Sequence, residues 1–165
     1  MNKLFALATA SALAIAPALA MTGPGVISLG DFPIAAAGQQ VTPLNLQQGL
    51  VGGPPALTGL TALSCQARFF YGAGGTKVNV YFQTSVDQGQ TWFDIANIAF
   101  TTASAVETFN LSGLNSVATP TAPFNLALPD NTTLNGPLGD RLQAVVVSQG
   151  IYTGSTLVST RCVTR

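Results

Sequence analysis

The chain has 165 residues, the size of one domain or of a small domain with a tail. Its six basic and six acidic residues cancel, charged residues make up only 7% of the chain, and histidine is absent. A neutral chain offers nucleic acid no electrostatic footprint, so we expect no nucleic-acid partner. The lack of histidine excludes a catalytic histidine and a histidine metal ligand, and a hydrophobic content of 47% argues against disorder.

Residues 1–20 have the pattern of a secretory signal peptide. An apolar run follows Lys3 and ends in Ala18-Leu19-Ala20, which fits the small-residue rule for cleavage. The run is Ala-rich and shorter than the roughly 20 residues of a spanning helix, so we expect no stable membrane span. Two other interpretations stay open: Met21 is the true start, or residues 1–20 are retained as an apolar arm that packs in an assembly.

Residues 21–58 are rich in Gly, Pro, Ala and Gln, and they contain strong breakers such as Gly52-Gly53-Pro54-Pro55. This composition predicts an extended arm with one short strand near Gln39–Leu46. The arm is expected to lie along its own domain or along a neighbouring subunit, with a simple linker as the alternative.

From residue 59 onward, apolar and polar residues alternate with period two, which is typical of half-buried strands. Short strands between turn-forming residues predict an all-β protein, an antiparallel, jelly-roll-like β-sandwich over residues 59–165. The predicted strands are Leu63–Tyr71, Val78–Gln83, Trp92–Phe100, Val106–Leu111, Arg141–Val147 and Thr156–Val163, with a long excursion over 112–139.

The eight residues SVDQGQTW fit the pattern S-x-D-x-G-x-T-W and resemble the Asp-box, a β-hairpin motif of sialidases and several unrelated β-proteins. Asp87 is expected to accept backbone N–H bonds within a tight turn, and Gly89 to supply a positive φ. Ser85 and Thr91 would flank the turn, and Trp92 would pack beneath it. The resemblance implies a structural hairpin, with a calcium or glycan site as the weaker alternative.

The acidic residues give little sign of catalysis. A glycosidase needs two carboxylates on either side of a bond, and Asp94 with Glu107 is the one pair that a hairpin could bring together. The turn-like segments at Asp130-Asn131 and Asp140 suit calcium chemically but lack the spacing of an EF-hand. A nucleophile would need a base, and Lys77 is expected to face water. We therefore predict no enzyme, no catalytic residues, no cofactor and no metal.

Cys65 and Cys162 lie in the first and last strong strands of the predicted domain. The end strands of a sandwich can lie side by side, so a disulfide between them is one expectation. Two buried thiols in the core are the second expectation, a bridge between subunits is the third, and the sequence leaves all three open.

A broader resemblance covers roughly residues 60–165. The run VNVYFQTSVDQGQTWFDIANIAF at residues 78–100, GPLGDRL at 136–142 and GIYTG at 150–154 are similar to small β-sandwich proteins of tailed bacteriophages and prophages. The resemblance implies a structural protein of a virion head, neck or tail. The expected partners are copies of itself and other virion proteins, and the expected state is a homo-oligomer.

A second hypothesis fits the N-terminus better. The signal-like segment, the predicted hairpin, and Tyr81 and Tyr152 as exposed aromatics would suit a secreted or periplasmic binding module for glycans. The two hypotheses differ in location, since the first expects the chain in a virion and the second expects cleavage and export.

Overall fold

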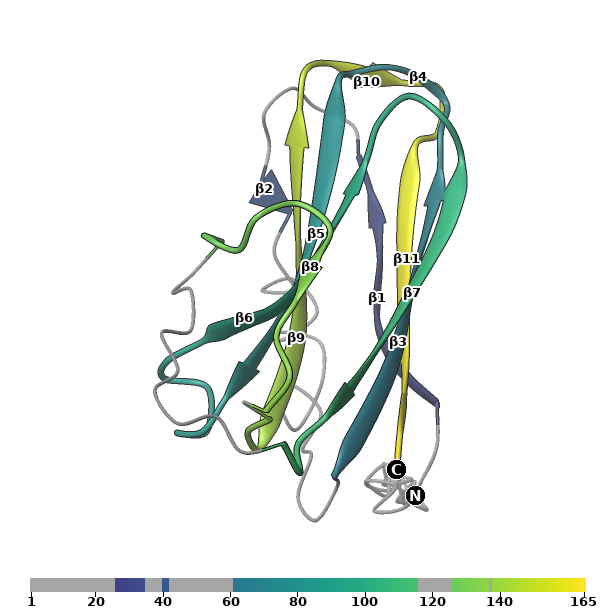
Figure 1. Cartoon of the computed structure of the whole chain (residues 1–165). Helices are drawn as coiled ribbons and strands as arrows, with labels where there is room; N and C mark the ends of the chain where they lie inside the picture. The colour runs from purple at the N-terminus through teal and green to yellow at the C-terminus, as the bar shows by residue number, and fades with distance from the viewer. Residues whose placement is uncertain (1–25, 35–39, 42–60, 116–125, 137) are drawn as a thin grey trace, which may run out of the picture.

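The computed structural model describes residues 26–34, 40–41, 61–115, 126–136 and 138–165, and every regular element within these ranges is a β-strand. The strands are β1 (Val26–Pro33), β2 (Gln40–Val41), β3 (Ala62–Phe70), β4 (Ala73–Gly74), β5 (Lys77–Ser85), β6 (Phe93–Phe100), β7 (Ala105–Ser112), β8 (Thr132–Thr133), β9 (Arg141–Gln149), β10 (Tyr152–Thr153) and β11 (Leu157–Thr164). They form two layers (Figure 1): sheet A has the order β1-β11-β3-β7, and sheet B has the order β2-β9-β5-β6-β8.

The strand pairing is that of a double ribbon rolled up on itself. Without the short strands β4, β8 and β10, the first strand pairs with the last (β1–β11), the second with the seventh (β2–β9), the third with the sixth (β3–β7) and the fourth with the fifth (β5–β6). The roll closes along two seams, where β11 meets β3 and where β9 meets β5. All pairs are antiparallel, and the predicted jelly-roll-like β-sandwich is confirmed.

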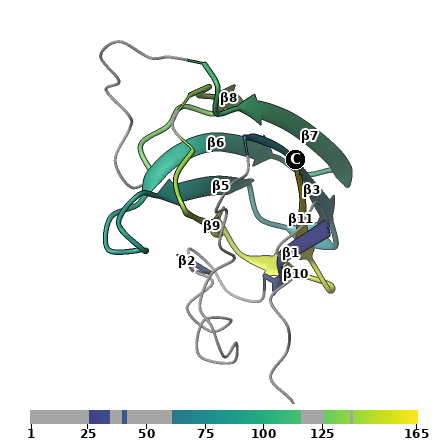
Figure 2. The ribbon, with the colours of Figure 1, turned by 90° about the horizontal axis from the view of Figure 1, so that it is seen from below.

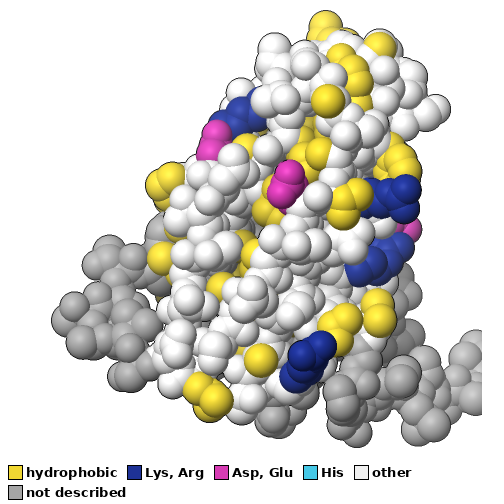
Figure 3. Space-filling view, turned by 45° about the vertical axis from the view of Figure 1, so that its right-hand side comes forward, with side chains coloured by type: hydrophobic (Ala, Val, Ile, Leu, Met, Phe, Trp, Pro, Cys, Tyr) yellow, Lys and Arg dark blue, Asp and Glu magenta, His cyan; other side chains and the backbone are white. Residues whose placement is uncertain are grey.

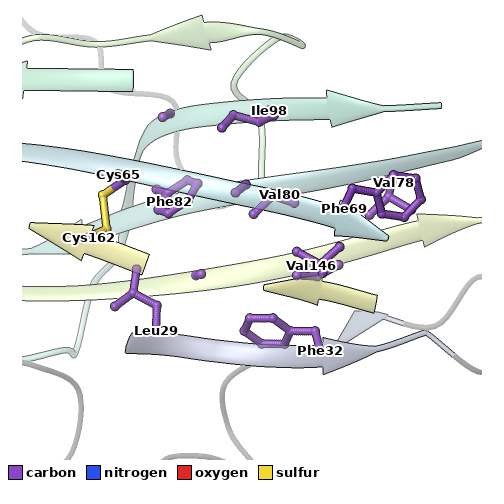
Figure 4. Packing of buried hydrophobic residues seen from close by; sticks show 14 of the residues in the cluster. Leu29, Phe32, Cys65, Phe69, Val78, Val80, Phe82, Ile98, Val146 and Cys162 are labelled. Carbon is purple, nitrogen blue, oxygen red and sulfur yellow. A yellow bond between two sulfur atoms is a disulfide. The ribbon is translucent and has the colours of Figure 1, made fainter. Parts of the chain in front are cut away.

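Side chains that alternate inward from both sheets form one hydrophobic core (Figure 4). The nine residues of β3 alternate between buried and exposed along most of their length, as a strand with one face on a core requires. Across the core, Phe69 stacks on Phe100 with ring centroids 5.2 Å apart, and Phe82 meets Phe109 edge-on at 4.8 Å. These aromatic pairs join sheet A to sheet B.

One end of the sandwich is closed by the β10–β4 ribbon, which crosses the top of Figure 1. The backbones approach so closely here that only glycine fits. A Cβ on Gly72 would lie 1.8 Å from the carbonyl oxygen of Gly154, and one on Gly75 would lie 2.0 Å from the ring of Tyr152. Tyr152 is 1% exposed, so the expectation of an exposed aromatic at this position is wrong.

The structure differs from the expected domain boundary at residue 59, because Val26–Pro33 is an integral strand of sheet A. β1 pairs with β11 over most of its length, and Leu29, Phe32 and Ile34 are buried in the core. A bulge between Ser28 and Gly30 interrupts the alternation, which is why this segment does not have the period of a strand in the sequence.

The strands predicted after residue 59 correspond to β3, β5, β6, β7, β9 and β11, with ends that differ by a few residues. β2 lies within the short strand expected near Gln39–Leu46, whose remainder is outside the described residues. The expectations for residues 1–20 also fall outside them. The predicted excursion over 112–139 contains β8, which pairs with β6.

Candidate functional site

The hairpin between β5 and β6 contains the residues that resemble an Asp-box. Ser85 Oγ donates a hydrogen bond to Asp87 Oδ1 at 2.7 Å and accepts one from the Gly89 N–H at 2.8 Å. The Thr91 N–H donates to the same Asp87 oxygen at 2.7 Å. Gly89 has a φ of 95°, and a Cβ there would lie 3.3 Å from the half-buried Trp92 ring. The local sequence therefore closes its own turn.

These hydrogen bonds have an electrostatic consequence. They lower the pKa of Asp87 to about 2, with the backbone N–H of Thr91 as the largest cause and the hydroxyls of Thr91 and Ser85 next. The carboxylate is charged at neutral pH, and its hydrogen bonds stay within the hairpin. Asp87 thus acts as a turn-closing residue.

A buried carboxylate holds the segment after residue 125 against the outer face of sheet B. Asp94, on β6, is fully buried and accepts hydrogen bonds from the backbone N–H groups of Leu126, Ala127 and Leu128 at 2.8–3.2 Å. The Gln83 amide of β5 donates to it at 2.7 Å. Three backbone donors and one amide satisfy the oxygens of this buried side chain, so Asp94 is a structural anchor.

A second polar cluster fixes the same segment a few residues further on. Asp130 accepts from Asn79 Nδ2 at 2.7 Å and forms an ion pair with Lys77. The hydrogen bond from Lys77 is the largest cause of the lowered pKa of Asp130. Asn97, also buried, accepts from Asn79 and donates to the Leu128 carbonyl at 2.8 Å. Lys77 is therefore engaged in an ion pair instead of simply facing water.

The acids considered for chemistry are not brought together. Asp94 lies on sheet B under residues 126–128, whereas Glu107 lies exposed on β7 of sheet A. Asp130 is paired with Lys77, and Asn131 accepts from the Ala99 N–H instead of facing a shared cation site. Among the described residues, no three His, Cys, Asp or Glu side chains form a group that could hold a metal ion.

Cys65 and Cys162 form a disulfide within the chain, the first of the three alternatives that the sequence left open. They are directly opposite each other on β3 and β11, their Cα atoms are 4.1 Å apart, and both are buried. The bond spans 97 residues of chain and crosses the seam where the last strand of the roll meets the third. It therefore locks the closure of the jelly roll.

The outer margin of sheet A at β7 is the least covered part of the sandwich that the structure describes. Val106, Glu107, Thr108 and Asn110 are exposed, and Val106 retains 52% of its surface. On this side of the molecule, hydrophobic side chains lie between polar ones, with Lys/Arg and Asp/Glu side chains scattered among them (Figure 3). A shallow groove separates β7 from the margin of sheet B, and it is lined by Asn97, Ile98, Ala99, Glu107, Thr108, Phe109, Asn131 and Thr133. In the view from below, β7 lies at the outer edge of its sheet (Figure 2).

Sequence reasoning did not identify β7 as a surface of interest. The segment AVETFNLS contains alternating apolar residues, which predict a strand, but sequence alone does not tell an edge strand from a central one. One signal was present: Glu107 stands at a position of the apolar alternation that faces the core side, and inward-pointing charges are a known feature of edge strands.

Comparisons of the chain with protein-family models, with curated proteins and with solved structures found no match. The described residues also include no helix that is long and apolar enough to cross a membrane.

Proposed function

We propose that this chain is a non-enzymatic structural protein of a phage-like virion, such as a capsid decoration, neck or tail component. It acts by packing against copies of itself and against other virion proteins. The observation that carries the proposal is the long, continuous and exposed edge strand β7 of sheet A. An exposed strand edge is a ready template for pairing with another chain.

Two further features support an assembly role. Two of the acids considered for catalysis, Asp94 and Asp130, are engaged in holding the fold. Eight-stranded jelly rolls also recur in viral capsid proteins, although they serve lectins as well, and a fold by itself does not specify a function.

The alternative is a secreted or periplasmic binding module, and the disulfide is the observation that favours it. Disulfides form and persist in oxidising compartments, and the Cys65–Cys162 bond is buried in the core. A virion that leaves its host meets the same conditions, so the bond is compatible with both proposals. The glycan version has lost part of its basis, because Tyr152 is buried.

The test is the intact mass of the native protein, measured without reduction, together with the size of the fraction that contains it. We expect a mass two hydrogens below that of the dithiol, in a fraction of virion size. A mass that begins at residue 21 or later, found only in a small soluble fraction, would overturn the virion proposal and favour the exported module.

A further inference from the structure

The backbone of β7 has a set of unpaired hydrogen-bonding groups whose positions follow from the disulfide. In an antiparallel pair, residues whose Cα atoms lie about 4.5 Å apart do not exchange backbone hydrogen bonds, whereas bonded pairs lie about 5.5 Å apart. The 4.1 Å between Cys65 and Cys162 makes them a non-bonded pair, so the N–H and C=O of Cys65 point away from β11 and toward β7. The residue opposite on that side, Phe109, is therefore bonded to β3.

Because the direction of the backbone N–H and C=O groups alternates along a strand, the direction at Phe109 also fixes it for the remaining residues of β7. Glu107 and Leu111 point their backbone groups toward β3 with Phe109, while Val106, Thr108 and Asn110 point theirs away from the sheet. The contacts at the end of the strand, at Ser112, support this assignment independently.

Ser112 belongs to the outward-pointing set, and its N–H donates to Asn135 Oδ1 at 3.4 Å while its C=O accepts from Gly136 N–H at 3.2 Å. Both partners lie on the side of β7 away from β3. The outward N–H and C=O groups of Ser112 are thus hydrogen-bonded within the same chain. The outward groups of Val106, Thr108 and Asn110 have no partner among the described residues.

The three open residues form a unit that is complementary to itself. In an antiparallel pair with a second β7 centred on Thr108, Thr108 lies opposite its own copy and Val106 lies opposite Asn110 of the other copy. Every open N–H then meets an open C=O, which gives about six hydrogen bonds. This is the reciprocal arrangement that a two-fold axis produces.

The charge of Glu107 distinguishes the register centred on Thr108 from the neighbouring register, which is centred on Glu107. Glu107 is the only charged residue of β7. A register centred on Glu107 would set two carboxylates directly opposite each other, which is destabilising. The register centred on Thr108 sets Glu107 opposite Phe109 of the other copy, and the formal net charge of zero leaves no overall repulsion between copies.

We propose that β7 is the surface through which two copies of this chain pair, edge to edge and antiparallel about Thr108, so that the two copies of sheet A become one continuous sheet. The pairing would place the side chains of one copy over the groove beside Phe109 and Ile98 of the other. The inference names a partner and a surface for the proposed assembly function and in that sense rests on it, but its test does not require particles.

Cysteine trapping in the full chain tests both the surface and its register. In the proposed pair, the two Thr108 Cα atoms lie about 5.5 Å apart, within the range of a disulfide, so Thr108→Cys should form a covalent dimer under mild oxidation. The matched control is Asn110→Cys on the same strand, because its two copies would lie about 14 Å apart along the strands and should stay monomeric. A mixture of Val106→Cys and Asn110→Cys should cross-link again.

The readout is intact mass without reduction, with a peptide map to verify that Cys65 and Cys162 remain paired. We expect most of the Thr108→Cys protein to become a dimer and at least ten times less of the Asn110→Cys protein. Equal cross-linking of the two variants, the reverse order, or none in either would overturn the proposal. Cross-linking of Thr108→Cys in native particles to a chain of another mass would also overturn it, since it would show a different occupant.

A proline variant gives a second, non-covalent test. Thr108→Pro removes an N–H that points away from the sheet, so the pairing with β3 should survive while the dimer is lost. Sedimentation should show a monomer where the unmodified chain shows a concentration-dependent dimer. The outcomes separate the two proposals: dimers without virion-sized fractions would contradict the function alone, and virion-sized fractions unaffected by Thr108→Pro would contradict the pairing alone.

Discussion

β1 and β7 are the two outer strands of sheet A, yet their margins are built differently. β1 contains a bulge between Ser28 and Gly30 and reaches Pro33, which has no N–H to offer a neighbour. The Gly30 carbonyl accepts hydrogen bonds from the Thr160 hydroxyl and from Arg161, each at 3.2 Å. β7 pairs with β3 over eight residues without interruption and contains neither Gly nor Pro.

Sheet A therefore has one edge, at β1, that is protected from the addition of another strand and one edge, at β7, that is open to it. Bulges and proline are devices by which proteins stop unwanted strand addition, and β1 has both. β7 has only its inward-pointing Glu107, a device that discourages some registers and permits others.

The first prediction concerns how firmly each margin is attached to the core. Phe32 of β1 is 2% exposed, so Phe32→Ala should lower the free energy of unfolding by about 3–5 kcal/mol. Phe109 of β7 is only partly buried, and Phe109→Ala should cost clearly less, including the roughly 0.5–1.5 kcal/mol of its edge-on contact with Phe82. Urea denaturation of both variants measures this, and equal losses would contradict the comparison.

The contrast between the margins also explains what the sequence could and could not predict. The period-two strands from Ala62 onward were predictable, because each buries one face on the core and leaves the other polar. β1 was not predictable, because its bulge places Leu29 and Phe32, three residues apart, on the same side of the strand. In addition, Gly30 and Pro33 give this segment the composition of a loop.

The pairing of strands that are far apart in the chain could not be predicted from the sequence, for a different reason. The sequence could not decide whether the disulfide forms, because only the folded roll places β11 beside β3, in the register that sets Cys162 opposite Cys65. The edge position of β7 depends on the same long-range order. By contrast, the hairpin of Ser85, Asp87 and Gly89 could be described in advance, since all of its hydrogen bonds are local.

The second prediction concerns the seam between the two halves of sheet A. Replacing both Cys65 and Cys162 by Ala should lower the free energy of unfolding by about 2–5 kcal/mol, and the chain-entropy model gives about 4.7 kcal/mol for a loop of this length. Because β1 depends on β11 and β7 depends on β3, amide exchange should rise along both sides of the seam. The unmodified protein under reductant is the control that separates loss of the bond from loss of the side chains.

The third prediction concerns the ion pair at the β1 margin. Arg161 lies 3.0 Å from the Asp31 carboxylate, and its hydrogen bond is the largest cause of the lowered pKa of Asp31. A lowered pKa contributes stability above the usual value of 3.8 that is lost as the pH falls below it. Arg161→Ala should therefore cost about 1 kcal/mol or less at pH 7, and the difference should shrink in acid.

The matched control for that measurement lies on the opposite margin. The side chain of Glu107 has no ion pair or hydrogen bond among the described residues, so Glu107→Gln should change stability by less than about 0.5 kcal/mol at pH 7. A pH-dependent loss in Glu107→Gln as large as that in Arg161→Ala would contradict the assignment of the ion pair to β1 alone.

The smallest effect is one of exchange rates at single amides, and it tests the backbone directions on β7. In dilute solution, where the chain is monomeric, the N–H groups of Val106, Thr108 and Asn110 should exchange with deuterium almost as fast as in an unfolded peptide. Those of Glu107 and Phe109 should be protected, because they are bonded to β3. NMR resolves each amide, so a uniform rate along the strand would contradict the alternation. Raising the protein concentration should then protect the first three amides and leave the other two unchanged, since only an added strand supplies partners on the open side of β7.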